Sequence, residues 1–276
     1  MGFVREAAVS GTFYPGNPRT LTKDIGRYLD NAVFDAVEGK IVGVISPHAG
    51  YMYSGPIAAY GYKAISHTTY DTVIVIAPSH RMYFEGVAIL EKGSYRTPFG
   101  VVDIDEELAA EIARKDRVVI PNIEAHKGEH SLEVQLPFLQ VVLKGFKIVP
   151  LIIGTQTVDV CEKLSACLYE TIKDRNRSIL VVGSTDLSHY HPYLSAVELD
   201  NVVVKHLSDF DIKGMSDDFN MNKLEACGAG PMITTMMLSK KLGATSSKVL
   251  KYANSGDVSG DKSSVVGYVS CVFYKT

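Results

Sequence analysis

The sequence predicts a single α/β domain of three layers, in which helices cover both faces of a mostly parallel but mixed central sheet. Short apolar runs alternate with helical segments along the whole chain, and such alternation is typical of βα units. Runs such as Val73–Ile76 and Ile179–Val182 do not alternate polar with apolar residues, so we expect them to be buried on both faces. No repeat or low-complexity linker divides residues 1–276, which favours one domain.

The expected strands are these short apolar runs and their flanking residues. In chain order they are Ile41–Ser46, Thr72–Ala77, Gly86–Leu90, Val118–Ile120, Lys147–Ile153, Ser178–Gly183, Lys248–Ala253 and Ser264–Tyr274. The last two flank a segment rich in Gly, Ser and Asp. We therefore expect them to form a hairpin, which would make the sheet mixed.

The expected helices lie between the strands and follow the helical spacing of apolar residues. They are Pro18–Val33, Gly55–Ile65, Asp105–Arg114, Ser131–Leu143, Val158–Arg175, Ala196–Leu207 and Pro231–Leu242. Ser131 precedes an amphipathic stretch, so it is expected to act as the N-cap of the fourth helix.

Composition excludes several classes of protein. Of the 276 residues, 46% are hydrophobic, which is too many for a disordered chain. The net charge is −3, from 28 basic and 31 acidic residues, so no nucleic-acid partner is expected. No apolar run approaches the roughly 20 residues that span a bilayer, and the start of the chain does not read as a signal peptide. We expect a soluble, cytoplasmic protein that does not act at a membrane.

Histidines follow several predicted strands, at the edge where open α/β sheets bind ligands. His48 follows the first strand, His80 the second, and His189 and His191 the strand ending at Gly183. Neutral imidazole is the commonest transition-metal ligand. This placement predicts a metal site in which His48 and His80 form the best pair.

The anionic member of such a site has two candidates, Asp186 and Cys227. Cys227 precedes an apolar helix, and a helix N-terminus favours the thiolate form. The other three cysteines form no metal-binding or disulfide spacing and are expected to be buried. A Cys–His hydrolase without metal, with His189 or His80 as its base, would use the same residues, and that alternative stays open.

Histidines outside this set divide into two groups. His130 lies in the segment Glu129–Gln135 at an expected helix start, where it is interpreted as a supporting or acid/base group. His67, His126 and His206 stand among polar residues and are expected to lie on the solvated surface.

Seven sequence motifs together resemble the Memo family. In order they are Ala7–Pro15 (AAVSGTFYP), Ser46–Gly55 (SPHAGYMYSG), Ala77–His80 (APSH), Tyr95–Phe99 (YRTPF), Glu129–Phe138 (EHSLEVQLPF), Ser184–His189 (STDLSH) and the pair Cys227–Gly228. They cover nearly the whole chain. The combination is specific, although each motif alone is weak.

The resemblance implies a fold similar to the class III extradiol dioxygenases, which are non-haem iron enzymes. It implies that His48, His80 and Cys227 bind iron or copper, with Asp186 and His189 beside them. The third iron ligand of true dioxygenases is a glutamate, and the resemblance implies that Cys227 stands in its place, so this chain departs from the ring-cleaving enzymes. Microbial members of the family often accompany a radical-SAM protein, which implies such a partner.

The leading hypothesis is a metal-dependent redox or oxygenase-like protein of unknown substrate. Fe(II) is the favoured metal, held by His48, His80 and Cys227, while Cu and Zn remain open because all three accept such ligands. His189, Asp186 and His130 would be the catalytic groups. We expect its ligand to be a small molecule or a peptide. One alternative is a non-catalytic protein that recognises a peptide or a partner protein through the same cleft. The other is a zinc- or Cys-dependent hydrolase.

Overall fold

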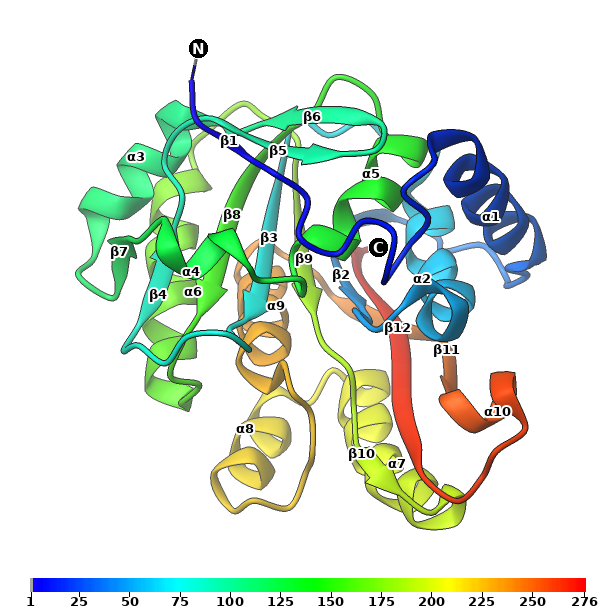
Figure 1. The fold of residues 1–276 in the computed structure, drawn as a ribbon. Helices are drawn as coiled ribbons and strands as arrows, with labels where there is room; N and C mark the ends of the chain where they lie inside the picture. Colours follow the sequence, from blue (N-terminus) through cyan, green and yellow to red (C-terminus); the bar gives the residue numbers. More distant parts are fainter. Residues whose placement is uncertain (1) are drawn as a thin grey trace.

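A central sheet of nine strands organises the computed structural model, which describes residues 2–276. Eight of its strands follow the order β10-β12-β2-β9-β3-β8-β4-β7, and β11 pairs with β12. The four strands β2, β9, β3 and β8 are parallel to one another, whereas β12 and β4 border them antiparallel. The predicted α/β class with a mixed, mostly parallel sheet is confirmed (Figure 1).

Eight of the twelve strands in residues 2–276 lie close to their expected positions, whereas β1, β5, β6 and β10 were not expected. Their bounds are β1 Val4–Arg5, β2 Lys40–Ser46, β3 Thr72–Pro78, β4 Val87–Ile89, β5 Ser94–Thr97, β6 Gly100–Asp103, β7 Val119–Pro121, β8 Lys147–Ile153, β9 Ile179–Ser184, β10 His189–His191, β11 Ser246–Asn254 and β12 Val265–Lys275. The final hairpin is also confirmed, because β11 and β12 pair antiparallel.

Helices connect the strands, and all seven expected helices have a counterpart. Their bounds are α1 Pro18–Asn31, α2 Tyr51–Ile65, α3 Glu106–Lys115, α4 Glu124–Lys127, α5 Leu136–Val142, α6 Val158–Ile172, α7 Tyr193–Asp209, α8 Ile212–Asn220, α9 Ala229–Lys241 and α10 Ser255–Ser259, with a 3₁₀ turn at Glu133–Gln135. None of these helices is long and apolar enough to cross a membrane.

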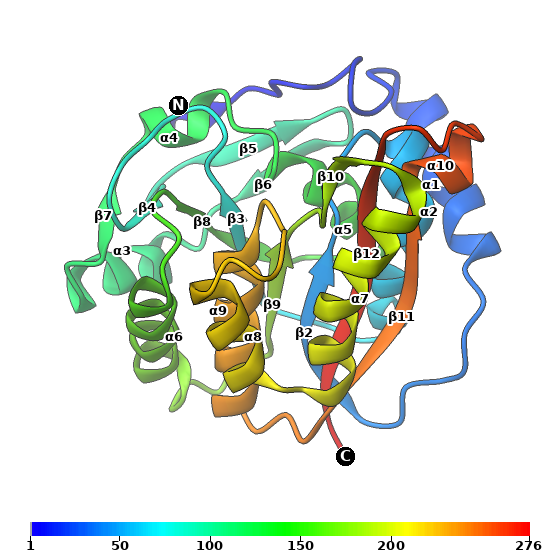
Figure 2. The same cartoon turned by 90° about the horizontal axis from the view of Figure 1, so that it is seen from below.

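The helices pack on both faces of the sheet, as the uninterrupted apolar strands require. A Cβ on Gly43 of β2 would overlap Ser239 of α9, whereas the next residue, Val44, contacts Gly61 of α2. Successive residues of a strand point to opposite faces, so α9 and α2 lie on opposite sides of β2. Figure 2 shows the two helices on either side of the sheet.

A second, three-stranded sheet was not expected. It consists of β1, β5 and β6 in the order β1-β5-β6, and its central hairpin turns at Pro98 and Phe99 between paired Thr97 and Gly100. The strands of this hairpin have four residues each, which is too short for a clear alternating pattern. The motif Tyr95–Phe99 therefore belongs to a hairpin beside the main sheet.

One expected helix start is wrong. The chain makes a turn and a 3₁₀ segment after Ser131 before α5 begins at Leu136. The Ser131 hydroxyl donates to the carbonyl of Pro78 instead of capping a helix (2.7 Å). Ser131 thereby ties the loop that carries His130 to the end of β3.

Candidate functional site

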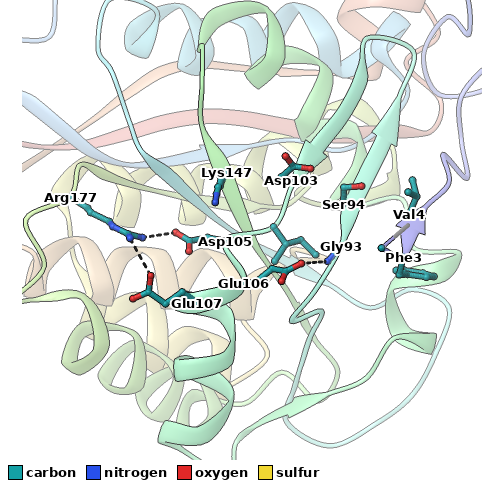
Figure 3. Close-up of a pocket in the computed structure, with 12 residues that line it drawn as sticks. Phe3, Val4, Gly93, Ser94, Asp103, Asp105, Glu106, Glu107, Lys147 and Arg177 are labelled. Atoms are coloured by element: carbon teal, nitrogen blue, oxygen red, sulfur yellow. Dashed lines mark hydrogen bonds and ion pairs between the residues drawn. The ribbon is translucent and has the colours of Figure 1, made fainter.

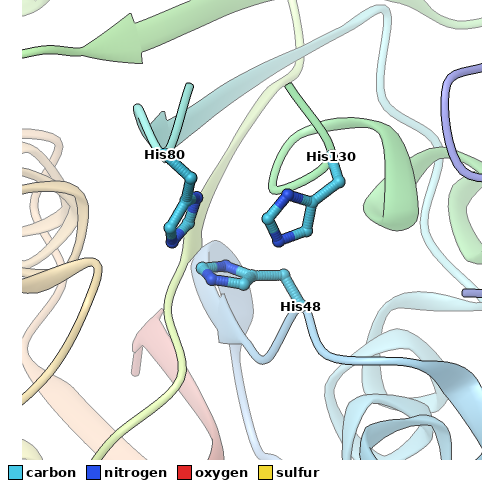
Figure 4. A group of neighbouring side chains, drawn as sticks. All are labelled: His48, His80 and His130. Carbon is cyan, nitrogen blue, oxygen red and sulfur yellow. The ribbon is translucent and has the colours of Figure 1, made fainter. Parts of the chain in front are cut away.

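Three histidines converge at the carboxyl edge of the parallel strands. His48 lies between β2 and α2, His80 two residues after β3, and His130 in the turn that follows α4. One nitrogen from each ring lies within 4.8 Å of the others, and the ring centroids are 4.7–5.6 Å apart. Figure 4 shows the three rings turned toward one another from three separate segments.

These rings line a cavity of about 600 Å³, which we call the histidine pocket. It is also lined by the other residues predicted for the site, Asp186, His189 and Cys227. Phe13, Tyr190 and Tyr268 contribute aromatic side chains. The structure therefore gathers all six predicted site residues around one cavity.

Hydrogen bonds determine which nitrogen of His48 carries the proton. The Ser184 hydroxyl donates to the carbonyl of Ser131 (2.7 Å), so its oxygen accepts from the His48 Nδ1–H (2.8 Å). Gln135 donates to the same oxygen, which completes its hydrogen bonds. His48 Nε2 therefore carries the lone pair, which can accept a hydrogen bond or bind a ligand.

A single carboxylate orients the other two histidines. Glu129 is 1% exposed, and its Oε1 lies 3.0 Å from His80 Nδ1 and 3.2 Å from His130 Nδ1. Burial raises the pKa of Glu129, but hydrogen bonds from His80 and from Ser131 outweigh it and lower the pKa to about 2. An ionised Glu129 therefore holds Nδ1–H of His80 and leaves its Nε2 free, as histidine ligands of metals require.

Two of the three histidines, His48 and His130, have lowered pKa values. Burial, with repulsion from the neighbouring imidazoles, holds the pKa of His48 well below its usual range. Burial also lowers the pKa of His130 to about 4, against the opposing effect of Glu129. Metal ligation requires neutral imidazole, so the site needs no proton loss from these two rings.

Cys227 approaches His48 but stands apart from the three-nitrogen group. Its Sγ lies 3.0 Å from His48 Nε2, and burial followed by the charge of Asp186 raises the pKa of the thiol. The protonated thiol thus donates to His48 Nε2. A Cβ on Gly228 would overlap the carbonyl of Ser184, so glycine lets the cysteine loop lie against the end of β9.

Asp186 and His189 present groups suited to proton transfer. Asp186 accepts the backbone N–H of His48 (2.7 Å), and burial raises the pKa of its carboxyl to about 7, although the backbone N–H groups of His48 and Ala49 lower it. His189 Nδ1–H donates to the carbonyl of Leu187 (2.8 Å), which leaves Nε2 as the basic nitrogen. A carboxyl group that titrates near neutral pH is suited to acid/base work.

A buried network holds the loop that carries His130, and no sequence pattern predicted it. Arg5 is 1% exposed and donates to the carbonyls of His126 and Glu129 and to the carboxylate of Glu133. Glu133 in turn accepts from the backbone N–H groups of Ala8 and Val9. The N-terminal segment is therefore bound to both sides of His130.

Two surface expectations are wrong. His126 is fully buried beneath this network, where the Tyr95 hydroxyl contacts its Nδ1 (2.6 Å). His206 bridges two carboxylates, Asp211 and Asp218, at 3.0 Å each. His67 is exposed as expected, and the three other cysteines are buried as expected.

A second cavity of similar size differs in its chemistry. It measures about 570 Å³ and lies near the start of β8. We call it the amino-edge cavity. Three of its charged side chains are paired, because Arg177 contacts both Asp105 and Glu107 (Figure 3). It brings no group of three ligand nitrogens together, so the histidine pocket is the candidate site.

Known proteins are similar to this chain over nearly its whole length. The model of the family described as Memo-like protein matches residues 5–272. A MEMO1 family protein of Sulfolobus acidocaldarius is 39% identical, with 98% of this chain and 99% of the relative covered. MEMO1 family proteins of Methanopyrus kandleri and Sulfurisphaera tokodaii are 37% and 39% identical, over 98% of this chain and 98–99% of theirs.

Proposed function

The chain belongs to the Memo-like protein family, and from this premise we propose that its histidine pocket is a metal-dependent redox centre. His48, His80 and His130 would hold the metal, and Fe(II) is the ion we favour. The single observation that carries the proposal is the convergence of one nitrogen from each of three rings within 4.8 Å. Three neutral imidazoles are a donor set that suits Fe, Cu and Zn.

Bound Fe(II) would supply a redox-active Lewis acid with coordination positions left for a small-molecule or peptide ligand. The residues of this chain would do the rest. Glu129 orients His80, and Ser184 orients His48. Asp186 and His189 would exchange protons with the ligand, and Phe13, Tyr190 and Tyr268 would contact its apolar part.

Cys227 stays a predicted ligand under this proposal. Its Sγ lies against His48 Nε2. To bind a metal, the thiol would have to lose its proton and give up its hydrogen bond to His48. The raised pKa of the thiol argues against the Cys-nucleophile hydrolase, because the thiolate is the reactive form. Binding of a peptide without catalysis has no observation of its own in favour.

The test is metal loading under anaerobic conditions. Loosely bound ions are then removed, and elemental analysis measures the metal that remains. We expect about one Fe per chain in the unmodified protein and loss of metal in His48→Ala, His80→Ala and His130→Ala. His67→Ala is the matched control, because His67 is exposed. Full retention of metal by all three variants would exclude the site.

Two further measurements test the ligands and the chemistry. Co(II) in place of iron gives a thiolate charge-transfer band only if Cys227 is a ligand, so Cys227→Ser and His130→Ala distinguish the two candidates for the third position. Oxygen consumption by the iron-loaded protein, lost in His48→Ala, tests the redox role. Stoichiometric metal with no change of oxidation state under oxygen or peroxide would leave a metal site but refute the redox function.

A further inference from the structure

A strongly basic pocket lies at the opposite edge of the sheet from the histidines. We call it the lysine pocket. It measures about 260 Å³ and is formed where β2 and β9 begin, where β12 ends, and where α6 and α9 end. Its cationic lining residues are Lys40, Lys173, Arg175, Arg177, Lys241 and Lys275. No Asp or Glu of residues 2–276 lines it.

Three of these cations have no carboxylate partner. Arg175 and Arg177 pair with acidic side chains near or on α3, and Lys173 pairs with Glu170. For Lys40, Lys241 and Lys275, the described part of the chain offers no ion pair within 4.0 Å. The pocket therefore retains positive charge in a protein whose net charge is −3.

Helix ends do not account for this charge. The C-terminal ends of α6 and α9 meet at the pocket, and each helix end carries about half a negative charge. Two such ends amount to about one charge, whereas three lysines are unpaired. Moreover, Lys40 belongs to strand β2 and not to a helix end. Lys275 belongs to β12, and its side chain lies beside Gly243, just after the end of α9.

Apolar residues line the pocket together with the cations. Val42, Ile172 and Ile179 line it and are buried, and Tyr169 contributes an aromatic ring. A lining that combines cations with apolar side chains fits a small molecule that joins anionic groups to a carbon skeleton. We propose that the lysine pocket binds a small phosphorylated metabolite through its phosphate groups.

Phosphate is the anion that suits these lysines best. Lysine ammonium groups bind phosphate oxygens as compact point charges with several donors each, and three unpaired lysines match a ligand that carries more than one phosphate. A nucleic-acid backbone is a poor alternative, because the pocket is small and the molecule as a whole is acidic. The proposal does not depend on the metal site, which lies at the other edge of the sheet.

Isothermal titration calorimetry of the full chain at low salt tests the proposal with a graded series of probes. Fructose 1,6-bisphosphate, fructose 6-phosphate and fructose share one skeleton and carry two, one and no phosphates. We expect saturable binding of the bisphosphate, at least about 10-fold weaker binding of the monophosphate, and none of fructose. Binding should weaken as salt rises.

Variants locate the binding. Lys40→Met/Lys241→Met should weaken bisphosphate binding at least about 10-fold, and Lys275→Met provides a second, independent replacement. Lys163→Met/Lys205→Met is the matched control, because it removes the same charge from exposed lysines that pair with Asp159 and Asp209. Thermal unfolding checks that each variant is folded, and His48→Ala should bind the bisphosphate normally.

Three results would overturn the proposal. The first is the absence of saturable binding by the unmodified protein at low salt. The second is an equal loss in the lysine-pocket variant and in the matched control, which would show that only overall charge matters. The third is unchanged binding in Lys40→Met/Lys241→Met and in Lys275→Met, which would place the ligand elsewhere.

Discussion

The histidine pocket and the amino-edge cavity are nearly equal in volume, at about 600 and 570 Å³, yet their charged groups differ in burial and pairing. In the first, Glu129 is 1% exposed and contacts the Nδ1 atoms of two histidines, His80 and His130. In the second, Glu107 is 70% exposed and lies between Arg175 and Arg177. The difference teaches that free lone pairs in a buried setting, and not cavity size, mark a candidate site.

Replacing the buried carboxylate that holds the N-terminal segment should have the largest effect. Glu133→Gln leaves Arg5 without its charged partner in a site excluded from water, so the free energy of unfolding should fall by about 3–5 kcal/mol. Urea denaturation measures the change. A loss under about 1 kcal/mol would show that this buried pair behaves like an exposed one.

The next largest effect is the loss of unfolding free energy as the pH falls. Burial lowers the pKa of His126 to about 3, with a further contribution from Arg5, whereas the unfolded chain has the ordinary value of 6.5. Between these values the unfolded state binds more protons, so stability is full above pH 6.5 and falls as the pH drops toward 3. We expect a loss on the order of a few kcal/mol. His126→Gln should flatten the profile of unfolding free energy against pH, and His67→Gln should not.

A smaller effect is expected for the carboxylate that orients the histidines. Glu129→Gln keeps the shape of the side chain but removes the anionic acceptor for His80 Nδ1–H, so metal affinity should fall about 10–100-fold. Competition with a chelator of known affinity measures it. Asp105→Asn in the amino-edge cavity is the matched control, and an equal loss there would contradict the assignment.

The smallest effect is expected at the amino-edge cavity itself. Glu107→Gln breaks two ion pairs that solvent already screens, so the free energy of unfolding should change by less than about 1 kcal/mol. The same denaturation series measures it beside Glu133→Gln. A loss of several kcal/mol would show that the ion pairs of the amino-edge cavity are not screened by solvent.

Strand positions were predictable because β3 and its parallel neighbours are apolar without interruption, and that signal needs no knowledge of contacts. The same logic predicted that His48 and His80 would meet, since parallel strands end at one edge. It could not show that the ring of His130 lies beside them. His130 lies in a loop with no regular secondary structure, and the two histidines that it meets, His48 and His80, lie far away in the sequence.

Arg5 shows most clearly what could not be predicted from the sequence. A single arginine near the start of a chain has no periodicity and no neighbouring motif, and exposure is the usual expectation for its residue type. Its burial depends on carbonyls and a carboxylate more than 120 residues away. His126 was misjudged for the same reason, because polar neighbours in sequence are not its neighbours in space. Glu129 lay in a motif that was singled out, but its role required the distances to two histidines.

The pairing of β12 with β2 has a consequence for how this protein matures during synthesis. The strand that leads to His48 lies between β9 and β12, and Cys271 pairs with Ile45, 226 residues earlier. A ribosome must therefore add residue 271 before this strand gains its second neighbour. Until then one edge of β2 has no partner and exposes apolar residues, the kind of surface that chaperones recognise in nascent chains. The histidine pocket is thus assembled late in the life of the growing polypeptide, and a stall in translation shortly before residue 265 would leave it without its final support.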